Sequence, residues 1–304
     1  MAEKTKLIAI IIPVFNGLDY TRKCLDSLSE LVPKKEPDSY GFEIVVVDDG
    51  SSDGTSDWIM KNHPAVHLES GTGNLWWSGG INKGIIYALE KLNAEYILWW
   101  NNDIQPAEDY FRNVIDLIDT HDENTIIGSK IYVLKNGLIW GMGGRFNPVT
   151  GKRHMYGERQ ADTADYQKPI DVDWFPGMGT IIHRSVFDKI SLLDEKNFPQ
   201  YHGDSDYTFR ARKAGLRLIA FPQLVIYNDD SNTGLIHKGK FSELYESLTS
   251  IKSNYNLKKD IAFFRKHSTS PIAYAELFRK YFMYIGGFCK WKILNSLGIY
   301  KTSK

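Results

Sequence analysis

The sequence predicts an α/β fold in which a mainly parallel β-sheet is flanked by helices. Apolar runs that suit buried strands alternate along the first half of the chain with segments whose apolar residues recur every three or four positions. A repeated succession of strand, loop and helix is typical of parallel sheets covered on both faces. Polar clusters directly follow several of the apolar runs. Because parallel sheets bind ligands outside the carboxyl ends of their strands, this placement also predicts a binding site there.

The individual elements follow from the same periodicity. Residues 7–14 are continuously apolar and predict a buried first strand, and residues 20–31 carry apolar residues at helical spacing. Further along we expect a strand at 42–47, a helix at 55–62, a helix at 81–92 and a strand at 96–100. The pattern loosens over 126–172, with short strand-like runs such as 130–134, before helices at 185–190 and 204–214 and one or two strands within 216–227.

The character of the sequence changes beyond about residue 232, where it becomes helix-like, basic and aromatic. We therefore expect one large domain over residues 1–235 and a C-terminal helical extension over residues 236–304. A chain of 304 residues is long enough to bury a sizeable core in such an arrangement.

Composition narrows the classes of protein to consider. The formal net charge is zero and the sequence pI is about 7.1, so no global field attracts nucleic acid and we expect no nucleic-acid partner. The two cysteines, Cys24 and Cys289, are far apart in the sequence. This spacing argues against a disulfide framework and fits a reducing, cytoplasmic compartment. No stretch of the sequence approaches the roughly 20 apolar residues that span a bilayer.

The segment that follows residues 42–47 reads Asp48-Asp49-Gly50-Ser51-Ser52-Asp53-Gly54. A calcium-binding loop starting at Asp49 would place Met60 where a bidentate glutamate is required, so we reject a calcium hand. Taken alone, the segment is equally well explained as a turn and helix cap. A functional interpretation therefore depends on the clusters that accompany it.

A second cluster, Asn101-Asn102-Asp103, directly follows the apolar run at 96–100. A carboxylate at a strand end can hold a hard divalent cation, which neutralises the charge of a departing diphosphate. Mg²⁺ needs only one or two protein carboxylates, so Asp103 alone is chemically sufficient. Without the other clusters, this triplet would be an ordinary loop.

The third cluster spans residues 201–210 and contains Asp204 and Asp206 near the expected start of a helix. Two carboxylates in this position stabilise a helix N-terminus through its dipole, which explains them without any catalytic role. Alternatively, one of them accepts the proton of a hydroxyl group as general base. We favour Asp204 as the base, because it is expected to precede the helix and point into a cleft, whereas Asp206 would cap the helix.

These clusters, taken in order, resemble a family 2 glycosyltransferase of the GT-A fold over roughly residues 6–235. The motifs are Pro13-Val14-Phe15-Asn16, Val46-Val47-Asp48-Asp49-Gly50-Ser51, Asn74 through Gly79-Gly80-Ile81-Asn82-Lys83-Gly84-Ile85, Asn101-Asn102-Asp103, and Gly203-Asp204-Ser205-Asp206 with Arg210. The resemblance implies inverting transfer of a sugar from a nucleotide diphosphate to a hydroxyl group. It also implies a nucleotide-binding half of about residues 1–125 and an acceptor half of about residues 126–235.

The resemblance implies a role for each matching residue. Those assigned to the nucleotide are Pro13, Phe15 and Asn16 as pocket lining, Asp48 at the base edge with Asp49 close by, and Asn82, Lys83 and Asn102 along its approach. Asp103 matches the last, metal-binding position of the family's Asp-x-Asp motif, so Mg²⁺ or Mn²⁺ is the implied cofactor. A UDP-, dTDP- or GDP-sugar is the implied donor, and Asp204 matches the catalytic base.

Two positions depart from the family's pattern. Many relatives carry a metal-binding histidine downstream of the base helix, whereas the matching segment here reads Tyr227-Asn228-Asp229-Asp230. Asn228 or Asp229 would then supply an oxygen ligand, or His237 would reach back, and we take Asn228 as the first candidate. The acidic residue that usually precedes the base is replaced by Gly203.

Contacts to the sugars are expected from Trp77, Trp174, Gly177 and Asp206. Large aromatic rings can stack on sugar faces, although packing over the sheet edge explains Trp77 equally well. Trp99 and Trp100 end an expected strand, so they should point to opposite faces of the sheet and lie in its core.

The Asn101-Asn102-Asp103 triplet and the Gly177-Met178-Gly179 segment are similar to bacterial rhamnosyltransferase-like members, which usually build surface polysaccharides. This similarity implies hexosyl or deoxyhexosyl transfer to a saccharide or lipid-linked acceptor.

Two rival functions deserve comparison. A sugar nucleotidyltransferase would want a glycine-rich loop with arginine or lysine right after the first strand, which residues 13–17 lack. A catalytically inactive carbohydrate-binding or scaffold protein on the same fold would be favoured by Gly203 and Asn228, but Asp48, Asp103 and Asp204 argue against it.

Residues 274–300 combine aromatic and aliphatic side chains with lysine and arginine, and Glu276 is their only acid. This composition is typical of a helix at a membrane interface, which would place the protein peripherally at the inner face of the cell membrane. The alternative is a helix packed on the catalytic domain or in a homodimer. Gly286-Gly287 is expected to weaken a continuous helix.

Overall fold

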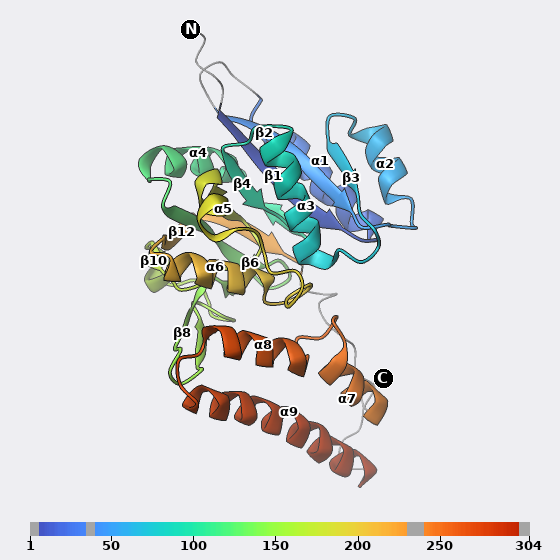
Figure 1. Cartoon of the computed structure of the whole chain (residues 1–304). Helices are drawn as coiled ribbons and strands as arrows, with labels where there is room; N and C mark the ends of the chain where they lie inside the picture. The colour runs from blue at the N-terminus through green and yellow to red at the C-terminus, as the bar shows by residue number, and fades with distance from the viewer. Residues whose placement is uncertain (1–5, 35–39, 230–239, 298–304) are drawn as a thin grey trace. The chain divides into compact units, whose positions relative to one another are not determined.

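The computed structural model describes residues 6–34, 40–229 and 240–297. The chain forms two compact units, and each is described by itself (Figure 1). The first comprises residues 1–145 and 154–232, and the second comprises residues 146–153 and 233–304. The domain boundary expected near residue 235 lies outside the described residues, so that boundary stays a prediction.

Strands of the first unit form one mixed sheet in the order β10-β12-β6-β11-β4-β1-β2-β3, with β5 paired to β12 and β7 to β6. The strands are β1 (Lys6–Val14), β2 (Tyr40–Asp48), β3 (His67–Ser70), β4 (Tyr96–Trp99), β5 (Ile104–Pro106), β6 (Thr125–Val133), β7 (Ile139–Gly141), β10 (Ile170–Asp171), β11 (Thr180–His183) and β12 (Arg217–Asn228). The four strands β4, β1, β2 and β3 are parallel to their neighbours within this group, as expected. Antiparallel pairs enter with β11, which lies between β4 and β6.

Helices cover both faces of this sheet. They are α1 (Leu18–Leu31), α2 (Thr55–Asn62), α3 (Trp76–Glu90), α4 (Tyr110–Thr120), α5 (Arg184–Ile190) and α6 (Gly203–Lys213). One apolar cluster joins the sheet to α1, α2 and α4, and a second cluster joins it to α3, α5 and α6. Periodicity did not predict β3, β5, β11 or α4, whereas α2 has the predicted bounds.

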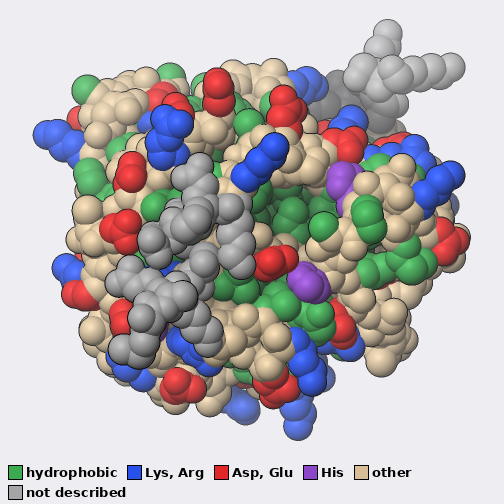
Figure 2. Space-filling view, turned by 90° about the horizontal axis from the view of Figure 1, so that it is seen from above, with side chains coloured by type: hydrophobic (Ala, Val, Ile, Leu, Met, Phe, Trp, Pro, Cys, Tyr) green, Lys and Arg blue, Asp and Glu red, His purple; other side chains and the backbone are tan. Residues whose placement is uncertain are grey.

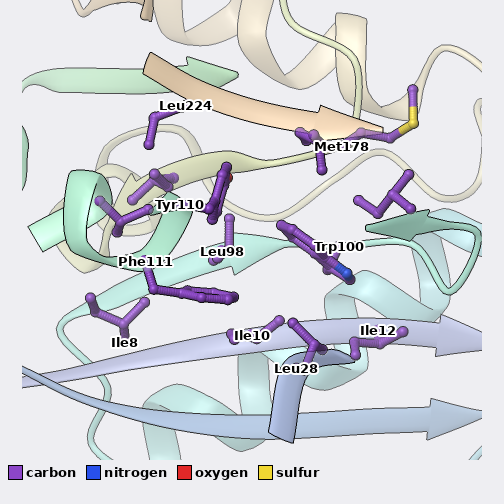
Figure 3. Close-up of a cluster of buried hydrophobic side chains, with 14 of the residues drawn as sticks. Ile8, Ile10, Ile12, Leu28, Leu98, Trp100, Tyr110, Phe111, Met178 and Leu224 are labelled. Carbon is purple, nitrogen blue, oxygen red and sulfur yellow. The ribbon is translucent and has the colours of Figure 1, made fainter. Parts of the chain in front are cut away.

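Alternation along β1 distributes the core between the two faces. Ile8, Ile10 and Ile12 belong to the cluster on the α1 side, and Ala9 and Ile11 belong to the cluster on the α3 side. Figure 3 shows the first of these clusters, with the β1 side chains facing the aromatic rings of α4. Buried side chains of this size contribute about 1.5–3 kcal/mol each to the hydrophobic stabilisation.

The prediction for the paired tryptophans is confirmed. Trp99 and Trp100 are both fully buried, and they belong to opposite clusters, because successive side chains of an extended chain point to opposite faces.

Helix α3 begins at Trp76, five residues before the expected start at residue 81. The glycines that suggested a loop lie within the helix, because they let it approach β1 closely. A Cβ on Gly84 would lie 2.3 Å from Cγ2 of Ile11, and one on Gly80 would lie 2.7 Å from Cβ of Pro13. Close packing of helix against strand therefore outweighs the low helix propensity of glycine.

The second unit contains α7 (Phe241–Thr249), α8 (Leu257–His267) and α9 (Ile272–Ser296), together with residues from the ribbon of β8 (Gly144–Phe146) and β9 (Arg153–Met155). The guanidinium group of Arg153 lies 4.1 Å from the ring centroid of Phe263 in α8. Helix α9 runs without interruption through Gly286 and Gly287, contrary to the expected weakening. Within the described ranges, no helix is long and apolar enough to cross a membrane.

The surface drawn in Figure 2 mixes the two signs of charge. Lysine and arginine side chains are interspersed there with aspartate and glutamate side chains.

Candidate active site

The parallel half of the sheet brings the segment after β1 and the segment after β2 together at the carboxyl ends of these strands. Val14 at the end of β1 pairs with Asp48 at the end of β2. Beyond this pair, the Asn16 N–H donates to Ser51 Oγ at 2.7 Å, and Asn16 Oδ1 accepts from the Ser52 N–H at 2.9 Å. Asn16 has a φ of 57°, in the left-handed region that asparagine tolerates better than most residues. Asn16 therefore fastens the loop after β1 to the loop after β2.

The carboxylates of Asp48 and Asp49 are both held by donors of the protein. Asp48 Oδ1 accepts from the Ser51 N–H at 2.8 Å, and its Oδ2 accepts from the Ser56 hydroxyl in α2. Asp49 accepts from three backbone N–H groups, those of Gly73, Leu75 and Trp76, at 2.7, 2.8 and 3.1 Å. Asp49 thus holds the segment that leads into α3, and the predicted contact of both residues with a nucleotide remains a prediction.

Two of the other residues assigned to the nucleotide lie at this same edge. Phe15 is 57% exposed directly beyond β1, where its ring is available to a ligand. Asn102 lies close to α1, since its side-chain amide donates to Thr21 Oγ1 at 3.0 Å.

Asn82 and Lys83 face a different part of the molecule. The Asn82 side chain exchanges hydrogen bonds with the backbone of Leu193 and donates to Glu195 at 2.8 Å, while Lys83 forms an ion pair with Glu69 at 3.1 Å. Both residues line a hollow of about 380 Å³ together with Glu69 and Glu195. The structure therefore gives Asn82 and Lys83 structural contacts, and their role toward a nucleotide stays a prediction.

Asp103 has the strongest electrostatic signature at the site. Its Oδ1 atom is buried and has no hydrogen-bond partner among the described residues. The pKa of its carboxyl group is raised to about 6, chiefly by burial and also by the nearby charge of Asp229, while hydrogen bonds from its own backbone and from Asn101 partly oppose these effects. A buried carboxylate oxygen without a hydrogen-bond partner is unfavourable unless a cation or a proton neutralises its negative charge.

The neighbour of Asp103 is Asp229 rather than Asn228. The antiparallel pairing of β5 with β12 places Asn228 opposite Ile104, and the Asp229 N–H donates to the Asp103 carbonyl at 3.0 Å. Because opposite residues share a face and successive residues alternate, Asn228 lies on the face of the buried Ile104. The structure therefore pairs Asp229 with Asp103, whereas the predicted metal-binding role of Asn228 stays a prediction and His237 lies outside the described residues.

This arrangement fits a divalent cation. Among the described residues, no group of three or more histidine, cysteine, aspartate or glutamate side chains is placed to hold a metal ion. Mg²⁺, however, is usually bound through one or two carboxylates and the phosphates of its substrate, which matches Asp103 and Asp229.

Asp204 and Asp206 occupy different environments. Helix α6 begins at Gly203, so Asp204 lies in its first turn rather than before it. Asp204 is only partly buried, and its oxygens accept the backbone N–H groups of Gly177 at 2.9 Å and of Ser205 at 2.6 Å. A carboxylate that is partly exposed in this way is chemically suited to accept the proton of a hydroxyl group.

Asp206 is fully buried and forms an ion pair with Arg210 at 3.0 Å. The same guanidinium group donates to the carbonyls of Ile190 and Leu192, which fastens α6 to the chain after α5. Asp206 is therefore a structural residue inside the helix. It does not cap the helix, because the N-cap residue is His202, and its burial does not fit the expected contact with a sugar.

Trp77 connects the two ends of the site. Its indole N–H donates to Asn101 Oδ1 at 2.9 Å, beside Asp103. Its ring also packs on Gly177, where a Cβ would lie 2.1 Å from Cζ2 of Trp77. Gly177 in turn donates its N–H to Asp204. A continuous series of contacts thus links the expected metal ligand to the expected base. The role of Asn101 was missed, although it belongs to the triplet that drew attention to Asp103.

Trp174 lies three residues before Gly177 in the sequence and forms an isolated β-bridge with Gly144. Its indole N–H is buried without a hydrogen-bond partner among the described residues, and its ring covers Gly144. Because this N–H is buried, it gives no support to the predicted sugar contact of Trp174, which stays a prediction.

A mixed sheet covered on both faces, with carboxylates gathered beyond its parallel strands, is the arrangement expected of the GT-A fold. The chain belongs to glycosyl transferase family 2, whose family model matches residues 9–190. The family assignment removes the sugar nucleotidyltransferase from the two rival functions. The matched range includes the clusters at Asp48 and Asp103 and ends before Asp204.

Relatives and solved structures agree with this family. A low-salt glycan biosynthesis hexosyltransferase, Agl10, of Haloferax volcanii is 28% identical over 186 residues, which cover 58% of this chain and 55% of that protein. The chain thus spans about half of that relative. An uncharacterized glycosyltransferase of Rickettsia typhi is 25% identical over an alignment of 317 residues that covers 94% of this chain and 89% of that protein.

Two solved structures show the same fold. GalNAc-T7 with UDP, GalNAc and Mn²⁺ matches with a TM-score of 0.58 and 16% identity, over 75% of this chain and 44% of that chain. Residues 1–349 of TarS from S. aureus in complex with UDP match with a TM-score of 0.53 and 17% identity, over 83% of this chain and 68% of that chain.

Proposed function

We propose that this glycosyltransferase moves a hexosyl or deoxyhexosyl group from a nucleotide-diphosphate sugar to an acceptor hydroxyl, with inversion at the anomeric carbon. The observation that carries the proposal is the series of contacts from Asp103 through Asn101, Trp77 and Gly177 to Asp204. It supports a base held at a fixed place relative to the group that would bind the donor's diphosphate.

Asp204 acts as the general base in this proposal. Its carboxylate takes the proton of the acceptor hydroxyl, and the oxygen attacks the anomeric carbon on the face opposite the leaving group. The new carbon–oxygen bond forms as the bond to the diphosphate breaks, and the nucleoside diphosphate departs with the electron pair. Backbone N–H groups of Gly177 and Ser205 hold the carboxylate in one orientation, which lowers the entropic cost of the step.

Asp103 and Asp229 would hold Mg²⁺ or Mn²⁺. When bound, the cation supplies positive charge that stabilises the departing diphosphate. Phe15, Asn16 and Asp48 line the strand ends where the nucleotide would bind. UDP is the first nucleotide to test, because TarS and GalNAc-T7 were solved with UDP. Related proteins are named for hexosyl and N-acetylglucosaminyl transfer, which supports a hexose-type donor over a rhamnosyl donor.

A saccharide or lipid-linked hydroxyl is the proposed acceptor. A hexosyltransferase of glycan biosynthesis and a poly(ribitol-phosphate) N-acetylglucosaminyltransferase among the relatives both support a role in polymer or glycan assembly. We place the protein in the cytoplasm, in peripheral contact with the inner face of the cell membrane.

Release of nucleoside diphosphate tests the proposal. The full-length protein is incubated with UDP-, dTDP- and GDP-sugars, with Mn²⁺ or Mg²⁺ and then with EDTA. Asp204→Asn should retain donor binding and lose about 10²- to 10⁴-fold in turnover, the usual contribution of a positioned base. Asp188→Asn, which changes an exposed carboxylate on α5, is the matched control. Donor binding without release by the wild type would indicate the inactive carbohydrate-binding protein instead.

A further inference from the structure

Helix α9 has a packed face and an exposed face. Ala273, Leu277 and Tyr281 are buried, and the Tyr281 hydroxyl donates to Asp260 of α8 at 2.9 Å. The ring of Tyr284 stacks on Tyr255, with centroids 3.8 Å apart and planes at 12°. One face of α9 is therefore fixed to the rest of its unit.

The other face presents a stripe of large apolar side chains. Phe278, Phe282, Ile285 and Ile293 are exposed at 72, 67, 37 and 59% of their surfaces. Their spacings of four, three and eight residues place them within about a 100° sector of an ideal helix. We name these four residues the α9 stripe. Exposure of this row to water is unfavourable, because burying apolar surface lowers the free energy in proportion to its area.

Cations flank the α9 stripe and dominate its unit. Arg279 and Lys290 are exposed on one side of the stripe. Residues 146–153 and 233–304 hold 15 of the 37 lysine and arginine residues of the chain, but only 4 of its 37 aspartate and glutamate residues. The second unit therefore has a formal charge of +11, and the remaining residues have a formal charge of −11.

We propose that the α9 stripe docks the second unit on an anionic lipid surface. The side chains of the α9 stripe would enter the headgroup region, while the surrounding lysine and arginine side chains would contact lipid phosphates. Charge complementarity favours this occupant over the α9 stripe of a second copy, because two units of +11 repel each other. A peripheral position also agrees with the finding that α9 is not apolar enough to span a bilayer. The inference deepens the proposed function by naming the membrane partner of the transferase.

The wild-type protein and a Phe278→Ser/Phe282→Ser variant are sedimented with vesicles of phosphatidylcholine containing phosphatidylglycerol, and with vesicles of phosphatidylcholine alone. We expect the wild type to bind the anionic vesicles at about 0.05 M salt and to be largely released at about 0.5 M, because the Debye length shortens. The double variant should bind at least about tenfold more weakly. Lys290→Glu, which reverses one flanking charge, should weaken binding about tenfold as well.

Met60→Ser is the matched control, because it removes a 58% exposed apolar side chain from α2 in the other unit. Its vesicle binding should equal that of the wild type. Far-UV circular dichroism checks that each variant keeps its helices. Equal binding by the double variant and the wild type, or equal binding to both vesicle types, would overturn the proposal. A wild-type dimer that the double variant loses, without vesicle binding, would show that a second copy covers the stripe.

Nucleoside diphosphate release is measured on the same samples without vesicles. We expect the double variant to retain wild-type release, because the α9 stripe contributes no residue to the candidate active site. Loss of vesicle binding by the double variant with unchanged nucleoside diphosphate release would test only the membrane proposal. Absence of release from the wild type would contradict only the proposed sugar transfer.

Discussion

Replacing Gly177 by alanine tests whether Trp77 positions the base. A Cβ at this position would lie 2.1 Å from Cζ2 and 2.5 Å from Cη2 of the Trp77 ring, whereas ordinary contacts begin at 3.4 Å. The ring or the backbone at residue 177 must therefore move by about 1.3 Å, the difference between 3.4 and 2.1 Å, to restore an ordinary contact. Movement of the backbone displaces the N–H that holds Asp204, and movement of the ring breaks the bond to Asn101.

A misplacement of about 1 Å in a catalytic arrangement can cost about 10²-fold in rate. We therefore expect kcat of Gly177→Ala to fall about 100-fold, equivalent to about 2.7 kcal/mol in activation free energy. The KM for the donor should change far less, because the contacts of Asp48 with Ser51 and Ser56 are untouched. The assay is steady-state release of nucleoside diphosphate from the donor.

A second substitution distinguishes positioning from general damage. Trp77→Leu removes the ring atoms that the new Cβ would meet, so the Gly177→Ala/Trp77→Leu variant should be more active than Gly177→Ala alone. Gly286→Ala is the control, since a Cβ there meets nothing within 4 Å. Wild-type turnover in Gly177→Ala, or a double variant no better than the single one, would refute the coupling of Trp77 to Asp204.

Other changes probe the neighbouring groups. Asp206→Asn should lower the free energy of unfolding by about 3 kcal/mol, because it breaks a buried ion pair, and an unchanged urea midpoint would contradict this. Asp103→Ala should abolish the Mn²⁺ dependence of nucleotide binding in calorimetric titrations. Asp229→Ala should weaken this dependence more than Asn228→Ala, and the reverse order would favour Asn228 as the metal ligand. Iodoacetamide at about pH 8 should spare Cys24, whose pKa is raised to about 12 by burial, leaving only ~10⁻⁴ as thiolate. An adduct at Cys24 by mass spectrometry would contradict its burial.

Periodicity predicted those strands and helices in which the apolar residues of the local sequence pattern are also the residues buried in the core. The apolar run of β1, the position of Asp48 at the end of β2 and the position of Asp103 in the segment after β4 could be read from neighbouring residues alone. Helix α4 could also have been found, because its buried Tyr110, Phe111, Val114, Leu117 and Ile118 recur at helical spacing. The start of α3 at Trp76 could not have been predicted from local periodicity, because it depends on how closely the helix packs on β1.

Pairing between distant segments determines the rest of the candidate site. Asp229 lies beside Asp103 because β12 pairs with β5, a register that no local signal specifies. The contact of Trp77 with Gly177 spans 100 residues of sequence, and only the fold brings them together. The separation of Asp204 from Asp206 likewise depends on Arg210, which draws Asp206 into the core.

The division of charge between the two units has a consequence for the protein in solution. A net charge of zero gives no long-range repulsion between copies, and oppositely charged regions of different copies attract each other. This attraction reaches about 30 Å at 0.01 M salt and about 8 Å at 0.15 M. Concentrated samples should therefore cluster reversibly in dilute buffer and disperse when salt is added. The same segregation should let the chain adsorb to both anion- and cation-exchange media near neutral pH, although its sequence pI is about 7.1.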